Sequence, residues 1–239
     1  MERITTKMDY EYMTADQRHA SRRPDVLVYQ TPVLTSDLAL AGPIEVDLWV
    51  STTGTDADWV VKVVDVFPND YPDSDTGPSG ARMGNYQMLI RGEPFRGKFR
   101  ESFSRPVPFE PGVATRVRFT MPDVCHTFRP GHRLMVQIQS SWFPLVDRNP
   151  QKFCDIYSAT EADFSSQKHT IHRGGEKASV ITIRATASYG GIAPGPSLTA
   201  ITTLLEYRIR IAPKPMIAQR MLGPAILENI SQLGMPTLV

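Results

Sequence analysis

The sequence predicts an all-β protein, most specifically a jelly-roll β-sandwich with an irregular or partly helical C-terminal tail. Short apolar segments with the alternation of β-strands recur at intervals of roughly 10 to 20 residues, separated by turn formers. The chain also has 20 prolines among 239 residues, which disfavours a helical protein because proline interrupts helix interiors. We find no convincing long amphipathic pattern before Ile183.

The stretch 43–66 is the predicted centre of the sandwich. From Ile44 to Val50 apolar and polar residues alternate, as in a strand buried on one face. From Trp59 to Val66 the apolar residues fall on both faces, which is typical of a strand covered on both sides. Because residues 52–58 between them are turn formers, we expect the two strands to run antiparallel through a tight connection.

The chain divides into three expected parts. Residues 1–23 are polar and mixed in charge and resemble a connecting segment, whereas residues 24–184 hold the predicted strands. Within this second part, the polar loop 69–80 should lie on the surface. Residues 185–239 form a tail in which prolines interrupt short apolar pieces, and its segment 216–233 could form a helix broken by proline.

Composition limits the classes of partner. Hydrophobic residues make up 41% and charged residues 21% of the chain, and the formal net charge is +1, so nothing in the charge favours nucleic acid or an anionic membrane. No apolar run is long enough for a transmembrane helix, and the N-terminus lacks the apolar segment of a signal peptide, so we expect a cytoplasmic protein. Cys125 and Cys154 need not pair in a chain of this size, although pairing remains open.

The sequence lacks the signature of an α/β-type serine hydrolase. Such enzymes place the nucleophilic serine in a G-x-S-x-G turn, and this pentapeptide is absent. Ser79 is the nearest glycine-flanked serine, but it lies in the polar loop with the wrong spacing, where turn formation explains it. We assign no catalytic residue.

Two groups of residues could bind a metal. His169 and His172 would point to opposite faces of an extended segment and have no third ligand, so solvated or hydrogen-bonded histidines explain them more simply than zinc. Four aspartates in and around the connection 52–58 could assemble a calcium site, but turn formation explains them more simply. The aspartates at 70–75 have the same two interpretations. We expect neither metal nor cofactor. The four aspartates of that possible calcium site are Asp47, Asp56, Asp58 and Asp65.

The passage 140–150 is the most unusual in the chain. Trp142 and Phe143 follow a strand and precede Asp147 and Arg148 within a proline-bounded loop. An aromatic pair beside an acid and a base could form a recognition surface. Trp142 could equally anchor the core, and both interpretations stay open.

Several motifs occur together in an order that resembles one hydrolase family. They are RRPDVLVY at 22–29, STTGTDADW at 51–59, KVVDV at 62–66, PGHRL at 130–134 and WFPLVDRNP at 142–150. With them, residues 4–183 resemble the C-terminal domain of the family of Xaa-Pro dipeptidyl peptidases, cocaine esterase and α-amino acid ester hydrolases. The tail after residue 184 does not resemble it.

The resemblance implies a galactose-binding-like jelly roll that packs against an α/β-hydrolase domain carrying a Ser-Asp-His triad. The triad would lie upstream of this part of the family, so no catalytic residue carries over. We therefore expect an accessory domain of a hydrolase acting on esters or peptide amides, without catalysis of its own. A stand-alone carbohydrate-binding or ligand-binding module is the alternative, a non-functional remnant is a third possibility, and a homo-oligomer is a further possible partner.

The resemblance also implies a covered surface. If a hydrolase domain lies on the sandwich, Trp49, or the face formed by Trp59, Val61 and Val63, would be an interdomain surface, exposed here unless the tail folds over it. The residues expected at an interdomain or ligand-facing surface are Tyr12, Asp16, Arg18, Trp49, Trp59, Trp142, Phe143, Asp147 and Arg148.

Overall fold

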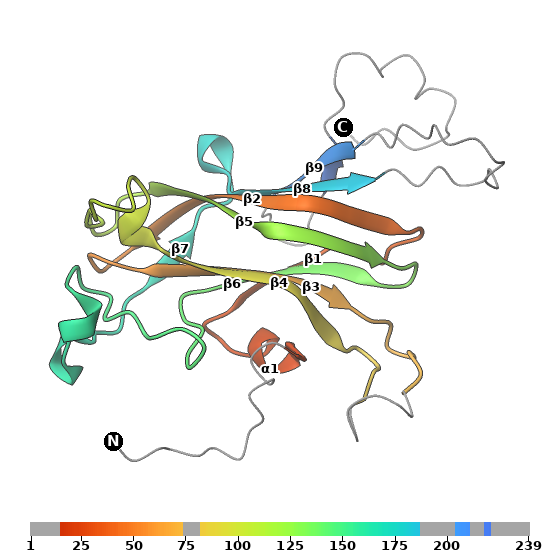
Figure 1. Ribbon diagram of the computed structural model, residues 1–239, viewed down its shortest axis with the longest axis horizontal. Helices are drawn as coiled ribbons and strands as arrows, with labels where there is room; N and C mark the ends of the chain where they lie inside the picture. The colour runs from red at the N-terminus through yellow and green to blue at the C-terminus, as the bar shows by residue number, and fades with distance from the viewer. Residues whose placement is uncertain (1–14, 74–81, 187–203, 211–217, 221–239) are drawn as a thin grey trace.

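The computed structural model describes residues 15–73, 82–186, 204–210 and 218–220. These residues form two antiparallel sheets that pack face to face, which confirms the expected all-β sandwich (Figure 1). The more specific jelly-roll assignment stays a prediction. The first sheet has the order β1-β6-β3-β4, with strands Leu27–Gln30 (β1), Arg133–Gln139 (β6), Asp58–Val66 (β3) and Gln87–Arg96 (β4).

The second sheet has the order β10-β9-β8-β2-β5, and β7 pairs with the end of β2 beyond β8. Its strands are Leu38–Thr52 (β2), Thr115–Phe128 (β5), His169–Ile171 (β7), Val180–Thr186 (β8), Leu204–Arg210 (β9) and Ala218–Arg220 (β10). The helical elements are short: Arg18–Ser21 (α1) and the 3-10 turns Gly97–Phe99, Ile156–Ser158, Glu161–Asp163 and Gly175–Lys177. None of these described helices is long and apolar enough to cross a membrane.

The core fills the space between the two sheets. Along β2 the side chains of Ile44, Val46, Leu48 and Val50 are at most 2% exposed and face the other sheet. The intervening positions, such as Glu45, are more exposed. The alternation seen in the sequence therefore positions β2 as expected, with one face in the core.

Strand β3 is buried along its whole length, which confirms its predicted two-sided cover. Trp59, Val61 and Val63 belong to the core between the sheets. The face expected as the alternative to Trp49 for an interdomain surface is therefore covered by the second sheet of the same chain. The opposite face, which includes Val60 and Val64, packs against other parts of the same chain.

Strands β2 and β3 do not form the hairpin that the turn-forming residues between them suggested. Strand β2 lies in the second sheet beside β5, whereas β3 lies in the first sheet between β6 and β4. The connection 53–57 therefore crosses from one sheet to the other. A strand buried on both faces needs neighbours on both edges and cover on both sides, and the centre of the first sheet supplies them.

Residues 15–21 pack on the outer face of the first sheet, where Figure 1 shows α1 below that sheet. The backbone N–H of Gln17 donates to the Gln87 carbonyl at 2.8 Å, and Gln17 is fully buried. Asp16 forms an isolated bridge with Met88 of β4. The described part of the expected connecting segment 1–23 thus covers the sheet, while residues 1–14 lie outside the described residues.

The tail continues the second sheet over its described part. Strand β9 pairs with β8, and β10 pairs with β9, so residues 204–210 and 218–220 are extended where irregular or helical structure was expected. The rest of the expected helix 216–233 lies outside the described residues, as does most of the polar loop 69–80, including Ser79. Its described end is exposed, as predicted.

Candidate functional site

The residues expected at one surface lie in separate places. Trp49 is on the outer face of the second sheet, with the Arg116 guanidinium 5.9 Å and the Lys177 ammonium 5.8 Å from its ring. Asp16 and Arg18 lie on the outer face of the first sheet, joined by an ion pair of 2.5 Å. Tyr12 lies outside the described residues.

Arg18 also ties this covering segment to the loop before β4. Its guanidinium donates to the carbonyls of Gly84 at 3.1 Å and Arg82 at 2.9 Å. The Asp16 carboxylate accepts the backbone N–H of Gln87 at 3.3 Å. The contacts of Asp16 and Arg18 in this structure therefore fix the segment to the sheet.

Trp142 and Phe143 point in different directions although they are neighbours in the chain. Trp142 is 6% exposed and packs with Val60 and Val146 on the outer face of the first sheet. A Cβ atom on Gly92 of β4 would lie 2.4 Å from Cη2 of this indole, so only glycine leaves room for it. Phe143 is 55% exposed. Of the two interpretations, anchoring fits Trp142 and an outward surface fits Phe143.

Lys62 of β3 is a buried cation beneath this cover, although nothing in its local sequence signals the burial. It is 1% exposed, and its Nζ donates to Oε1 of Gln17 at 2.8 Å and lies 4.5 Å from the Trp142 ring centroid. Burial and, to a smaller extent, the positive charge of Arg23 together lower the pKa of Lys62 to about 8. Lys62 thus joins the two segments that cover β3.

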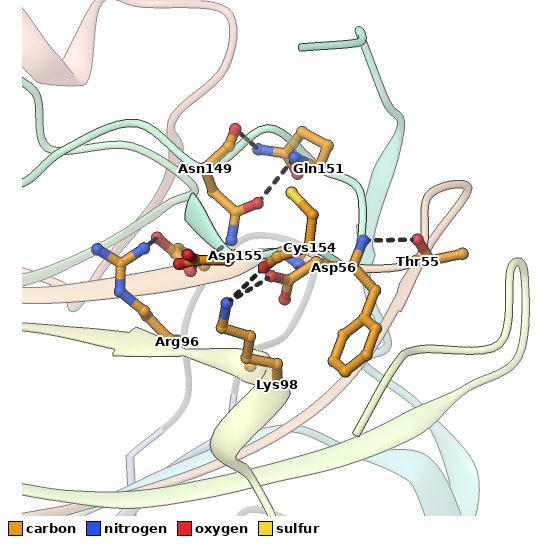
Figure 2. A network of polar contacts seen from close by, with 12 residues as sticks. Thr55, Asp56, Arg96, Lys98, Asn149, Gln151, Cys154 and Asp155 are labelled. Atoms are coloured by element: carbon orange, nitrogen blue, oxygen red, sulfur yellow. Dashed lines mark hydrogen bonds and ion pairs between the residues drawn. The ribbon is translucent and has the colours of Figure 1, made fainter. Parts of the chain in front are cut away.

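A polar network lies at the other end of the loop 140–150, beside the connection between β2 and β3 (Figure 2). Asn149 donates from Nδ2 to Oδ1 of Asp58 at 2.8 Å. Arg96 of β4 lies 3.4 Å from the second oxygen of Asp58 and 2.5 Å from Oδ1 of Asp147. Burial raises the pKa of Asp58 to about 6, against the opposing effects of Asn149 and Arg96.

Asp56 extends the network into the interior. It is fully buried, its Oδ1 accepts the backbone N–H of Ala57 at 2.8 Å, and Oδ2 lies 4.0 Å from Nζ of Lys98. Lys98 also donates to the carbonyl of Cys154 at 3.0 Å, as Figure 2 shows. Burial raises the pKa of Asp56. Arg96 and Lys98 had no local signal in the sequence, whereas Asn149 stood in the DRNP motif without an assigned role.

Two of the four aspartates considered for calcium, Asp47 and Asp65, lie away from this network and have other partners. Asp47 pairs with Arg116 at 2.8 and 2.6 Å on the outer face of the second sheet. Asp65 is buried, and its two oxygens lie 2.9 Å from Nε2 of His126 and 2.8 Å from Nδ1 of His132. Across the described ranges no group of three or more His, Cys, Asp or Glu side chains could hold a metal ion.

The remaining histidines and the cysteines form no catalytic centre in the described residues. His172 Nε2 lies 3.1 Å from Oγ of Ser51, but Ser51 is only 8% exposed and no carboxylate bonds the ring within this part of the chain. His169 instead packs edge-on against Trp59, with ring centroids 5.4 Å apart. Cys125 and Cys154 are both free thiols.

A cavity of about 420 Å³ lies beside the network, where β1 and β6 of the first sheet approach β7. Trp59, Phe164 and His169 supply aromatic groups, and Arg148 supplies a guanidinium that lies 5.1 Å from the Phe164 ring centroid. Two of the residues expected to face a ligand, Trp59 and Arg148, thus line one cavity. The other polar lining residues include Gln139, Ser140, Ser141, Asn149, Gln151, Ser165, Ser166 and Gln167.

Comparison with known proteins gives a consistent result. Residues 5–182 match the family described as X-Pro dipeptidyl-peptidase C-terminal non-catalytic domain. The cocaine esterase of Rhodococcus sp. (strain MB1 Bresler) is 35% identical over 169 residues, which cover 71% of this chain and 27% of the esterase.

Two solved structures have the same fold over the same share of the chain. An aminopeptidase from the marine sediment archaeon Thaumarchaeota archaeon matches with a TM-score of 0.67 and 42% identity, covering 72% of this chain and 28% of the aminopeptidase. A selenomethionine-labelled α-amino acid ester hydrolase matches with a TM-score of 0.66 and 41% identity, covering 72% and 27%. The chain therefore belongs to the family of X-Pro dipeptidyl-peptidase C-terminal non-catalytic domains.

Proposed function

We propose that this chain is an accessory domain that packs on a separate α/β-hydrolase domain and helps shape its substrate site, without catalysis of its own. The family match carries the proposal: it covers residues 5–182, whereas the chain spans only 27% of the cocaine esterase. The names of the relatives refer to ester and peptide hydrolysis, so we propose esters or peptide amides as the substrate class of the assembled enzyme.

We place the docking surface on the loops between β6 and β7. Half of the ten exposed large hydrophobic residues in the described part of the chain fall between 143 and 164. The Arg148 guanidinium lies 5.5 Å from the Phe143 ring and 5.1 Å from the Phe164 ring, so these residues adjoin. Exposed apolar groups around an arginine are typical of a protein interface. The five residues are Phe143, Leu145, Phe153, Tyr157 and Phe164.

A chimera tests the accessory role. Residues 5–186 replace the matching C-terminal domain of the α-amino acid ester hydrolase, and turnover of an activated ester is compared with that of the same enzyme truncated before this domain. We expect the chimera to be active and the truncated enzyme to be impaired. The isolated chain should not be labelled by a fluorophosphonate probe. A chimera no better than the truncated enzyme, or a labelled serine in this chain, would overturn the proposal.

The docking surface has its own test within the chimera. Phe143→Ser with Leu145→Ser should weaken the interdomain contact by about tenfold or more, because central apolar residues dominate interface energies. This loss should appear as a lower melting temperature of the catalytic domain and lower turnover. Phe103→Ser is the matched control, since Phe103 is 83% exposed but lies outside this surface. Equal effects of the two changes would contradict the placement.

A further inference from the structure

We propose that the cavity beside β7 binds a small neutral ligand with several hydroxyl groups, of the monosaccharide or disaccharide class. This inference goes beyond the accessory role and does not depend on a hydrolase domain. The cavity measures about 420 Å³, within the usual range for small-molecule sites. Its walls come from both sheets, through Leu27 of β1, Trp59 of β3, Ile138 of β6 and Ile171 of β7.

Unpaired polar atoms concentrate around this cavity. In the described part of the chain, eight buried side-chain nitrogen or oxygen atoms have no hydrogen-bond partner, and four of them belong to residues that line it. Trp59 and Gln139 are only 2% and 5% exposed. Since buried polar groups are nearly always paired in folded proteins, these atoms mark positions where bound water, or a ligand that displaces it, can supply the partner. The four atoms are Nε1 of Trp59, Oε1 of Gln139, Oε1 of Gln151 and Nδ1 of His169.

Gln151 is held in place by the polar network of Figure 2. Its φ angle of 68° lies in the left-handed region, which is uncommon for a residue other than glycine. Its backbone N–H donates to Oδ1 of Asn149 at 2.7 Å, and its carbonyl accepts the N–H of Thr55 at 3.2 Å. A Cβ on Gly54 would lie 2.3 Å from that carbonyl oxygen. The surroundings therefore impose a strained backbone on a residue whose Oε1 stays unpaired, a combination that recurs at ligand sites.

The chemistry of the lining selects the ligand class. Trp59 offers a donor, Gln139 and Gln151 offer acceptors, and His169 offers either according to its tautomer. Hydroxyl groups both donate and accept, so a ligand with several of them can satisfy this mixed set after small rotations of these four side chains. The aromatic rings can contact the C–H groups of a sugar ring. Burial lowers the pKa of His169, which keeps its ring neutral at pH 7.

The charges of the lining disfavour a cationic ligand. Arg148 is its cation and Asp25 its anion, so the described lining carries no net excess of either sign. Asp25 is already paired with Arg23 through two hydrogen bonds. An ammonium ion would therefore meet the Arg148 guanidinium and no free carboxylate in this lining, whereas the hydroxyl groups of a neutral polyol can accept hydrogen bonds from Arg148.

Indole signals provide a test with internal controls. The chain has three tryptophans, so a ¹⁵N-labelled sample gives three indole N–H resonances, which Trp49→Phe, Trp142→Phe and Trp59→Phe assign directly or by elimination. Six sugars are titrated to tens of millimolar: glucose, galactose, mannose, N-acetylglucosamine, maltose and lactose. We expect at least one to shift the Trp59 resonance saturably, because its N–H gains an acceptor, while Trp49 and Trp142 stay unchanged.

A glycine substitution separates binding from folding. Gln151→Gly removes the amide while suiting the positive φ, so the fold should persist and the affinity for the sugar that binds should fall at least tenfold. Asn85→Gly is the matched control, because Asn85 also has a positive φ of 57° but lies away from the cavity. The proposal is overturned if no probe shifts Trp59 saturably, if all three indoles shift alike, or if Gln151→Gly binds as well as the parent chain. Neither result bears on hydrolase docking, which the chimera tests separately.

Discussion

Lys62→Met should remove a large pH dependence of stability. The fold holds the pKa of Lys62 at about 8, against 10.5 for an unperturbed lysine. The unfolded chain therefore binds more protons between these two values, and the free energy of unfolding rises with pH across this window. A shift from 10.5 to about 8 corresponds to about 3 kcal/mol. The parent chain should gain that amount relative to Lys62→Met between pH 7.5 and pH 10.5.

The pH slope is a better measure than stability at one pH. Methionine removes the cost of burying an ammonium group, but it also removes the hydrogen bond that Nζ donates to Oε1 of Gln17, and a hydrogen bond from a charged group contributes about 1.5–3 kcal/mol. It also loses the contact between a cation and the Trp142 ring. These effects oppose one another near neutral pH, whereas the difference in slope between the parent chain and Lys62→Met from pH 8 to 10.5 reports the titration of Lys62.

Urea unfolding at a series of pH values measures this slope, since the extrapolated free energy of unfolding is compared at each pH. Lys168→Met is the control, because it replaces an exposed lysine by the same residue. Parallel curves for the parent chain and Lys62→Met would refute the reasoning. In that case Lys62 would keep its charge in contact with water, and the cover formed by Gln17 and Trp142 would not close over it.

Two further stability predictions follow from the same face and from the polar network. Gly92→Ala should destabilise the fold by about 1–3 kcal/mol, because the new Cβ would lie 2.4 Å from the Trp142 ring. Thermal melts measure this loss. Gly174→Ala is the control and should melt like the parent chain, because nothing lies within 4 Å of a Cβ at this position. In the parent chain, the raised pKa of Asp58 should lower the free energy of unfolding as the pH rises from 3.8 to about 6, because the folded state binds the proton more tightly. Asp58→Asn should abolish this decrease. Arg23 holds the pKa of Asp25 low, so the ionised carboxylate of Asp25 stabilises the parent chain and this stabilisation is lost as the pH falls. Urea unfolding should show that Asp25→Asn abolishes this loss at low pH.

Local patterns predicted the strands but not their arrangement. The apolar residues on both faces of 59–66 indicated two-sided burial, and the structure buries all nine residues of β3. The turn formers at 52–58 indicated only a reversal of direction. They carried no information on whether the next strand would pair with β2 or cross to the other sheet, because pairing depends on neighbours distant in sequence, such as β6.

The candidate site was predictable only in part for the same reason. Trp59 and Arg148 stood out by residue type, and both line the cavity. Lys62 did not, because its burial depends on Gln17, which lies 45 positions away in a segment with the composition of a linker. Gln151 had no signal either, since its positive φ is imposed by contacts with the turn between β2 and β3.

The loop from Trp142 to Gln151 connects the two proposals. Trp142 fixes its start against Gly92, and Asn149 fixes its end against Asp58. Between these points Phe143 and Leu145 are exposed, while Gln151 lies at the cavity. A loop held at both ends loses little conformational entropy on binding, so its outward residues are prepared for a partner. The chain's own covering segments already close the outer face of β3. The proposed docking of a hydrolase domain therefore does not require it to bury that strand, and Phe143 and Leu145 are the apolar contacts that we propose for it.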